Sequence, residues 1–217
     1  MIKPGQQKFC QISQEWDFLK FHNLRDFRWT SEWIDQKQNR IEKIFELNKI
    51  KSLDLYISPF AFHNWIWHTI LGFNFSDDKK IYLSVEWQLD IGEKYSFWKA
   101  IWPWYRIRYI RWTEKDIIWL RAEFWKEKIY KYPLHISIDM IKSLFLWFVW
   151  KTNESKNHTE HYGLIANNCT SSLWITAKQH LNMKKWHWGL VFNKFLPKFL
   201  NKLDILNLNE KERIMKV

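Results

Sequence analysis

The amino-acid sequence predicts one α+β domain, from the order of its hydrophobic patterns and from its length. Short runs rich in β-branched and aromatic residues occupy residues 53–134, and longer apolar runs with helical spacing follow them. The chain has 217 residues, of which 47% are hydrophobic, so one sizeable core can be buried. Neither an internal repeat nor a low-complexity linker divides the sequence.

The strands are predicted from short apolar runs that turn-forming residues separate. The first 50 residues are polar and charged with scattered aromatics, and residues 41–47 are the short helix expected there. The runs expected as strands are residues 53–58, 66–73, 81–87, 105–110, 117–121 and 129–134. Between the second and third runs, a Ser-Asp-Asp cluster favours a turn.

Helices are predicted in the last third of the chain. Ser137 is a candidate N-cap because apolar residues follow it at helical spacing. These apolar positions are Ile141, Leu144, Phe145, Phe148 and Val149. A second helix is expected to begin at the Asn-Asn-Cys-Thr segment, residues 167–170, and a third at residues 192–203. The charged residues from 207 onward predict a frayed tail.

Cys169 is the candidate nucleophile because it lies on the first turn of that second helix. The positive end of the helix dipole and its unpaired backbone N–H groups favour the thiolate there. His68 lies in a strand-like run far upstream, and a thiol with a distant histidine indicates nucleophilic catalysis. His63 is the alternative base. The histidines lack metal-ligand spacing with cysteines, so neither a metal nor another cofactor is expected.

The charge and the tryptophan content indicate an anionic partner. The net charge is +11, and 17 residues are tryptophan, a residue that favours the headgroup level of a bilayer. Nucleic acid is disfavoured because the charge is spread along the chain without a recognisable binding motif. No apolar run reaches the roughly 18 residues of a spanning helix, and the N-terminus lacks the apolar core of a signal peptide. Trp98, Trp102 and Trp104 are candidates to face lipid, with a buried aromatic cluster as the alternative.

Taken in order, several segments resemble the thiol-dependent domain of bacterial lipoprotein N-acyltransferases of the Lnb type. The resemblance covers most of the chain. The matching segments are Asn-Leu-Arg-Asp-Phe at 23–27, Lys-Ser-Leu-Asp-Leu at 51–55, His-Thr-Ile-Leu-Gly-Phe at 68–73, Ser-Val-Glu at 84–86, Gly-Glu-Lys-Tyr-Ser at 92–96, Lys-Tyr-Pro-Leu at 131–134 and Tyr-Gly-Leu-Ile-Ala-Asn-Asn-Cys-Thr at 162–170. The last segment also resembles the wider circularly permuted papain-like superfamily, which includes NlpC-type proteins.

The resemblance implies a circularly permuted papain-like (NlpC-like) fold, in which an antiparallel sheet packs against a cysteine-bearing helix. It implies an N-terminal extension at residues 1–50 packed on the core, a thiol domain at residues 51–205 and a charged tail at residues 206–217. It also implies a peripheral location on the periplasmic face of the inner membrane.

The resemblance further implies a role for each site residue. Cys169 is the nucleophile and His68 its base. Glu86 orients the imidazole, with Ser84 behind it on the same strand face at a period of two residues. Asn168 and Asn167 support an oxyanion hole formed by backbone N–H groups at the start of the helix.

The activity implied is a two-step acyl transfer. A phospholipid donates an acyl chain to the thiol, and an amine, such as a lipoprotein N-terminus, accepts it from the thioester. An anionic membrane surface is the implied partner. Two alternatives stay open: a thiol hydrolase of the same fold, cutting an amide or peptide, and a non-enzymatic basic protein of the membrane surface. In one departure from the family pattern, Thr-Glu-Lys-Asp at 113–116 replaces an acidic-arginine turn.

Overall fold

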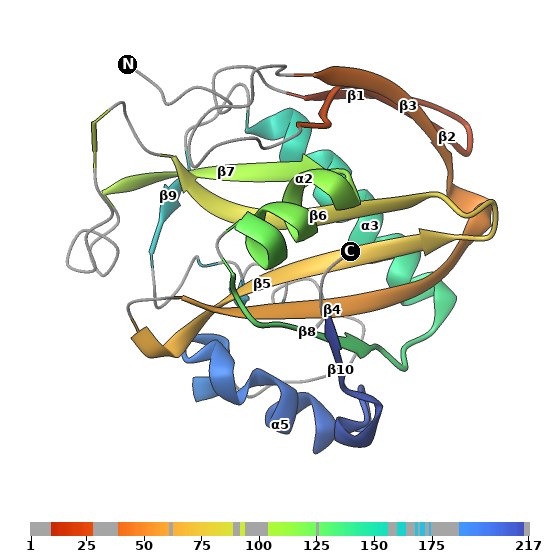
Figure 1. The fold of residues 1–217 in the computed structure, drawn as a ribbon. Coiled ribbons are helices and arrows are strands. Elements are labelled where there is room, and N and C mark those ends of the chain that lie inside the picture. The colour runs from red at the N-terminus through yellow and green to blue at the C-terminus, as the bar shows by residue number, and fades with distance from the viewer. Residues whose placement is uncertain are drawn as a thin grey trace.

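A mixed α/β architecture with a curved antiparallel sheet is observed in the computed structural model. The structure describes residues 10–27, 39–60, 63–88, 92–93, 104–124, 126–155, 160–163, 168, 170–171, 174 and 187–214. Within these ranges ten strands form one sheet (Figure 1). The expected antiparallel sheet with accompanying helices is therefore confirmed.

The strands are joined mostly as antiparallel neighbours. The order across the sheet is β1 (Gln11–Glu15), β2 (Phe18–Arg25), β7 (Tyr105–Trp112), β6 (Lys80–Gln88), β5 (His63–Phe75), β4 (Ile50–Phe60), β8 (Ile129–Pro133) and β10 (Glu212–Ile214). In addition, β3 (Arg40–Glu46) pairs with β2, and β9 (His161–Tyr162) pairs with β7. The contact between β2 and β7 is parallel and consists of the pair Arg25 and Trp112.

Helices cover both faces of the sheet. The longer ones are α2 (Glu114–Trp119), which continues into a π-helical turn η2 (Leu120–Phe124), α3 (Ile138–Glu154) and α5 (Leu196–Asn201). The 3-10 turns are η1 (Leu47–Lys49), η3 (Trp188–Leu190), η4 (Asn193–Phe195) and η5 (Leu208–Glu210). Figure 1 shows α2 in front of the strands and α3 behind them. None of the helices in the described part of the chain is long and apolar enough to cross a bilayer.

The core lies mainly on the α3 side of the sheet. Alternate residues of each strand point to opposite faces, so Leu71 and Phe73 face α3 while Ile70 faces α2. On the α3 side, the rings of Phe73 and Phe145 lie 5.0 Å apart within a large aliphatic and aromatic cluster. On the α2 side, Tyr56 and Tyr82 pack with Ile70, Ile117 and Ile118 in a smaller cluster. The two layers give each face of the sheet its own environment.

Five of the expected strands and the helix after Ser137 are confirmed. Four of these strands lie within β4, β5, β6 and β7, and the fifth, expected at residues 129–134, is β8, which ends one residue earlier. Ser137 caps α3, because its side chain accepts a hydrogen bond from Met140 N at 3.3 Å. The third expected helix is shorter than residues 192–203, since η4 precedes α5.

Three expectations about local structure are wrong. Residues 41–47 are mostly strand β3, because Phe45 packs 5.2 Å from Phe21 of the antiparallel partner β2. Residues 117–121 are helical, since their unbroken apolar run fits a buried helix as well as a strand. The described part of the tail, residues 207–214, is not frayed: β10 pairs with β8, and Lys131 Nζ binds Glu212 Oε2 at 3.2 Å.

Candidate active site

His68 lies on β5 where this strand separates from its neighbour β6. Pairing between the two strands runs from Asn74 and Lys80 to Leu71 and Leu83, and no further pair forms between their described residues. Beyond that point Ser84 replaces the backbone ladder: its hydroxyl donates to the carbonyl oxygen of Thr69 at 2.9 Å. The imidazole of His68 is 2% exposed and occupies the space beside this hydroxyl.

Two acceptors hold the Nε2 atom of His68. The Oγ atom of Ser84 lies 3.0 Å from it and the Oε1 atom of Glu86 lies 3.2 Å from it. Since the Ser84 hydroxyl hydrogen is directed to Thr69, both contacts are satisfied by a hydrogen on Nε2. In a neutral imidazole this tautomer leaves the lone pair on Nδ1. Ser84 and Glu86 therefore both contact the imidazole of His68 at Nε2.

A buried charged network extends this cluster toward α2. Arg121, on η2, lies 3.5 Å from Glu86 Oε1 through Nη2 and 3.0 Å from Glu127 Oε2 through Nη1. Glu127 also accepts a hydrogen bond of 2.6 Å from the hydroxyl of Ser58 on β4. The network thus links Glu86 to η2 through Arg121, and from there to β4 through Glu127 and Ser58.

The electrostatics favour a neutral imidazole beside an ionised carboxylate. Burial and the charge of Arg121 lower the pKa of His68, and the hydrogen bond with Glu86 offsets this only in part. Burial raises the pKa of Glu86, but the hydrogen bond from His68 and the charge of Arg121 outweigh it, so the net shift is downward. A neutral histidine is the form that can accept a proton from a thiol.

The turn around residue 169 is organised by Asn168. Its Oδ1 atom accepts hydrogen bonds of 2.7 Å from the backbone N–H groups of Thr170 and Ser171. Its Nδ2 atom donates to the carbonyl oxygen of Leu190 at 3.0 Å. Trp174 N then donates to Thr170 O at 2.9 Å, which is a helical hydrogen bond. Asn168 is therefore a side-chain cap of this turn.

Several of the residues expected in the site lie outside the described part of the chain. Cys169 and Asn167 lie outside the described residues, as does the side chain of His63. Trp98 and Trp102 also lie outside them, whereas Trp104 is 69% exposed. Among the residues that are described, no group of three or more histidine, cysteine or acidic side chains is arranged to hold a metal.

A buried triad of polar side chains connects the strand of His68 to the turn around residue 169. The hydroxyls of Thr69 and Thr170 lie 3.0 Å apart. The Nδ2 atom of Asn193, on η4, donates to Thr69 Oγ1 at 3.1 Å and to Thr170 Oγ1 at 2.6 Å. All three residues are buried. The residue that follows His68 thus contacts the residue that follows Cys169, although their separation in sequence is 101 positions.

This contact is made on the α3 side of the sheet. Consecutive residues of a strand point to opposite faces, so Thr69 faces Thr170 while His68 faces Glu86 and Arg121 on the α2 side. The two sides meet beyond the last pair of β5 and β6, where Ser84 bonds both the ring of His68 and the carbonyl of Thr69.

Sequence reasoning missed Arg121, Glu127, Thr69 and Asn193. Arg121 lies in a run expected as a strand and Asn193 in a run expected as a helix, where a polar residue usually faces solvent. Thr69 belongs to a motif of the family resemblance, but the motif does not predict its contact with Thr170. No local pattern in the sequence signals these long-range contacts.

Comparison with known proteins identifies one family likeness. The sequence matches the model of the family described as the Lnb N-terminal periplasmic domain over residues 37–190, which is more than half of the chain. No curated protein and no solved structure shows significant similarity to this sequence.

Proposed function

The chain belongs to the Lnb N-terminal periplasmic domain family, and from this premise we propose that it is a thiol acyltransferase. Cys169 is the nucleophile, His68 its base and Glu86 the residue that orients the base. The observation that carries the proposal is the hydrogen bond between Thr69 and Thr170. It brings the strand of the candidate base to the turn of the candidate nucleophile.

The proposed geometry depends on the separation of β5 and β6. The hydrogen on Nε2 of His68 is held by Ser84 and Glu86, so Nδ1 is the basic atom. The sulfur of Cys169 approaches this atom at the edge where the strands part. A circularly permuted papain-like (NlpC-like) arrangement, with Cys169 at the start of a helix, meets this requirement. The cap that Asn168 provides supports it.

The first chemical step forms a thioester. His68 takes the thiol proton, and the sulfur attacks the carbonyl carbon of a phospholipid ester. The C–S bond forms as the C–O bond breaks, and His68 returns the proton to the oxygen of the departing lysophospholipid. The backbone N–H of Cys169, with the side chain of Asn167, stabilises the oxyanion, because the neighbouring N–H groups of the turn already donate within it. Asn168 supports the turn instead, because its amide is already bonded to Thr170, Ser171 and Leu190.

The second step transfers the acyl group to an amine. The nitrogen of the amine attacks the thioester carbonyl, the C–N bond forms and the C–S bond breaks. The surplus proton on nitrogen passes to His68 and from it to the thiolate, which regenerates the resting site. The acceptor we propose is the free α-amine of a diacylglyceryl-cysteine at a lipoprotein N-terminus.

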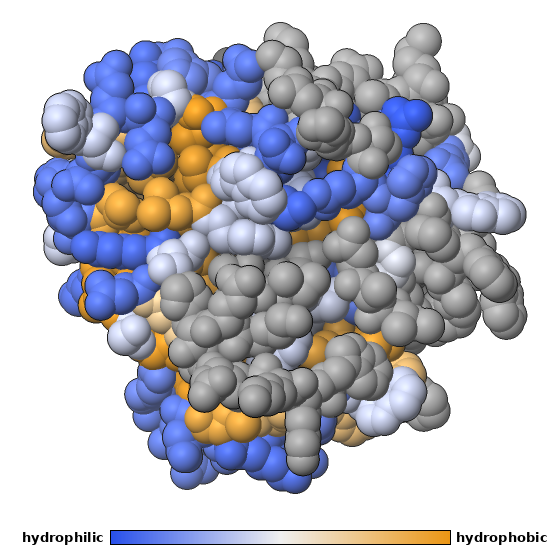
Figure 2. Space-filling view, turned by 180° about the vertical axis from the view of Figure 1, so that it is seen from behind, coloured by the Kyte–Doolittle hydropathy of each residue, from blue (hydrophilic) through white to orange (hydrophobic). Residues whose placement is uncertain are grey.

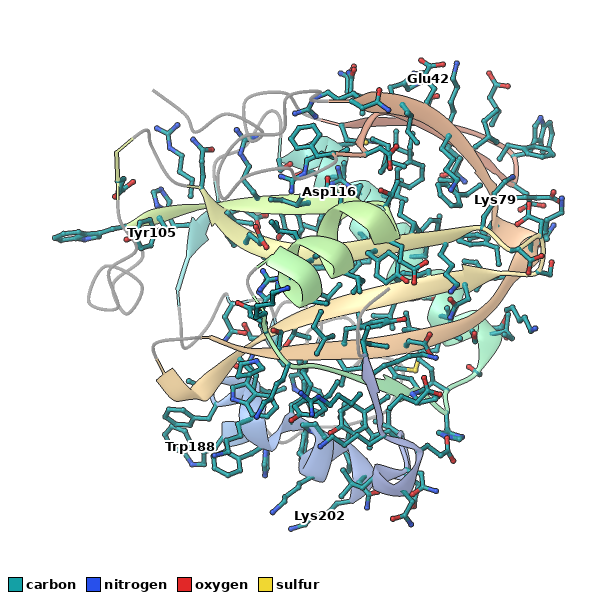
Figure 3. All side chains as sticks on the ribbon, viewed as in Figure 1. Glu42, Lys79, Tyr105, Asp116, Trp188 and Lys202 are labelled. Carbon is teal, nitrogen blue, oxygen red and sulfur yellow. The ribbon has the colours of Figure 1, made fainter. Side chains whose placement is uncertain are left out.

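The membrane surface we propose for this domain lies over η3, η4 and α5. Trp188 is 65% exposed and Phe195 is 43% exposed. Lys194, Lys198 and Lys202 are exposed beside them. Indole and phenyl rings with adjacent ammonium groups match the headgroup level of an anionic bilayer. Figure 3 shows Trp188 and Lys202 projecting from the same end of the molecule, and Figure 2 shows hydrophobic surface there between hydrophilic residues.

The test uses the purified chain and a phospholipid with a labelled acyl chain. We expect label to appear on Cys169 as a thioester that hydroxylamine removes, and to appear on a diacylglyceryl-cysteine peptide when that amine is added. Cys169→Ala is the matched control and should carry no label.

Other outcomes of this experiment identify the alternatives. If the thioester forms and the label appears only as free fatty acid, the domain is a thiol hydrolase. If no label is incorporated and Cys169→Ala retains vesicle binding, the domain is a non-enzymatic protein of the membrane surface. Either result would overturn the acyltransferase assignment.

A further inference from the structure

An apolar cavity lies on the α3 side of the sheet, between β4, β5, α3 and α5. Its walls are almost entirely aliphatic side chains, among them Leu55, Leu71, Leu144 and Leu196. The enclosed space between them measures about 70 Å³, and about 550 Å³ when the open mouth and the solvent in it are counted as well.

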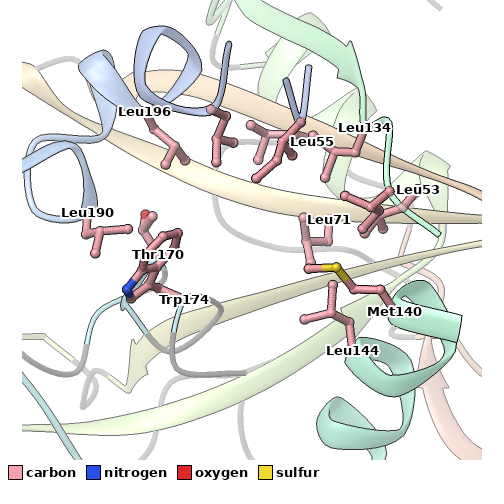
Figure 4. A pocket seen from close by; sticks show the side chains of 13 residues that line it. Leu53, Leu55, Leu71, Leu134, Met140, Leu144, Thr170, Trp174, Leu190 and Leu196 are labelled. Carbon is pink, nitrogen blue, oxygen red and sulfur yellow. The ribbon is translucent and has the colours of Figure 1, made fainter. Parts of the chain in front are cut away.

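The cavity extends away from the turn around residue 169. Thr170, Trp174 and Leu190 lie at one end, and Leu53, Met140 and Leu144 lie at the other (Figure 4). Thr170 is the polar residue of the described lining, and its hydroxyl is bonded to Thr69 and Asn193. The end that holds Thr170 is therefore one residue along the chain from the candidate nucleophile.

We infer that this cavity binds the hydrocarbon tail of the transferred acyl group. The inference rests on the proposed function, since it takes the acyl carbonyl to be at Cys169. The tail then runs past Thr170 and Trp174 toward Leu144. Polar substrates do not suit these walls, because the described lining offers no charged group and its one hydroxyl is already bonded. A cavity with such walls gives water too few polar partners, so a hydrocarbon chain is the ligand that matches it.

The chemistry of the cavity predicts a dependence on chain length. Each methylene that leaves water contributes about 0.8 kcal/mol, which is roughly a fourfold gain in affinity. Affinity should therefore increase with the length of the acyl chain until the chain reaches the far end of the cavity. A larger side chain at that end removes the space for the last methylenes and leaves the space near Thr170 unchanged. Leu144 is the residue to enlarge, and Leu53 beside it is a second site.

The test measures binding of free fatty acids to the full chain carrying Cys169→Ala, which prevents acylation. Decanoate and palmitate compete with a dansylated fatty acid whose fluorescence reports occupancy. We expect palmitate to bind more tightly than decanoate by at least tenfold, on the methylene scale above. Adding Leu144→Phe or Leu53→Phe should weaken the binding of palmitate by about tenfold, because about two of its methylenes lose their place in the cavity. The affinity for decanoate should stay nearly unchanged. The matched control is Leu83→Phe, at a buried leucine of the same core outside the described lining.

The possible results separate this inference from the proposed function. Equal affinities for the two fatty acids, equal effects of Leu144→Phe and Leu83→Phe, or no binding at all would overturn the cavity assignment. If Cys169 is acylated by phospholipid and yet no fatty acid binds, only the cavity assignment fails. If fatty acids bind with the expected length dependence and Cys169 is never acylated, only the acyltransferase assignment fails. Circular dichroism of each variant identifies one that has not folded, and Leu53→Phe then decides in place of Leu144→Phe.

Discussion

At the residue scale, the surroundings of His68 determine how its proton moves. The acceptors at Nε2 come from alternate positions of β6, and Glu86 is itself held by Arg121. Arg121 lowers the pKa of His68 and Glu86 raises it, so the imidazole lies between opposing charges. Glu86 and Arg121 therefore have opposite effects on the pKa of His68, and substitutions can separate them.

Glu86→Gln should shift the acid limb of the rate profile to lower pH. Glu86 raises the pKa of His68, so removal of its charge leaves the downward effects of burial and Arg121 less opposed. The base then stays neutral at more acidic pH, while the maximal rate falls because the ring is less well oriented. The dependence of kcat/KM on pH for acyl transfer measures both effects.

Glu127→Gln is the matched control for that variant. Glu127 also raises the pKa of His68, but it acts from farther along the network, through Arg121. Its acid limb should move in the same direction by a smaller amount, with the maximal rate less affected. An acid limb that moves upward in Glu86→Gln would contradict the assigned roles.

Asp116→Asn should destabilise the fold strongly. Asp116 is fully buried and accepts two hydrogen bonds from Arg25, at 2.7 and 2.9 Å, and one from Phe27 N at 3.2 Å. Asparagine removes the charge of the carboxylate that Arg25 binds through two hydrogen bonds, which costs about 3 kcal/mol in the free energy of unfolding. Urea denaturation measures the change. As a control, Glu42→Gln removes an exposed partner of Lys20 and should leave the urea midpoint unchanged.

The Arg25–Asp116 pair also shows where residue-scale prediction ends. The sequence placed Arg25 in a recognisable motif and Asp116 in a turn, but nothing local indicates that the two meet across 91 positions. The same limit applies to Thr69 and Thr170. Glu86 and Ser84, by contrast, were predictable because a two-residue period places both on one face of a strand.

At the element scale, the local sequence pattern predicts a strand correctly where its residue types favour a strand over a helix. β4, β5 and β6 are rich in β-branched and aromatic residues, and they were expected close to their observed positions. Residues 117–121 are also apolar, but here tertiary contacts decide, because the buried Asp116 holds the first turn of α2 against Arg25. Residues 41–47 form a strand and not a helix because they pair with β2 in antiparallel register.

Gly72→Ala should destabilise β5. A Cβ atom at this position would lie 2.7 Å from Cε2 of Tyr56 and 3.2 Å from Cε1 of Tyr82, and both rings are buried. The rings must shift to admit the methyl group, which costs about 1–3 kcal/mol in the free energy of unfolding. Thermal or urea unfolding measures it.

Gly163→Ala is the matched control for this substitution. Among the described residues, no heavy atom lies within 4 Å of a Cβ built on Gly163, and its backbone is not in the left-handed region. Its stability should stay close to that of the wild type. Equal stabilities of the two variants would show that the tyrosine rings do not restrict position 72.

At the scale of the whole molecule, the sheet separates the charged network of the candidate site from the apolar cavity. The α2 side carries the network of His68, Glu86 and Arg121, and the α3 side carries the cavity that begins at Thr170. The proposed reaction needs both, and β5 and β6 part where the two sides meet. The family resemblance and the two-residue period of a strand predict His68, Ser84 and Glu86 of the polar network but not its Arg121. The cavity could not be anticipated, because its leucines come from segments that only the folded chain brings together.

The surface over η3, η4 and α5 should direct the domain to anionic bilayers. Replacing Lys194, Lys198 and Lys202 together by glutamine removes three exposed charges next to Trp188. Each such lysine contributes about 1 kcal/mol near an anionic surface, so binding to phosphatidylglycerol vesicles should weaken by roughly a hundredfold at low salt. Sedimentation with vesicles measures this loss, and binding of the wild type should decline as salt is raised.

A matched triple variant tests whether the position of the lysines matters or only the net charge of the protein. Lys20, Lys79 and Lys80 lie on β2 and at the turn between β5 and β6, far from α5 in Figure 1. Their replacement by glutamine changes the net charge by the same amount and should leave most of the vesicle affinity intact. Trp188→Ala should weaken binding to both neutral and anionic vesicles, because the indole contributes through the interface and not through charge. Equal losses in the two lysine triples would mean that the basic charge acts as a whole and that no particular face meets the membrane.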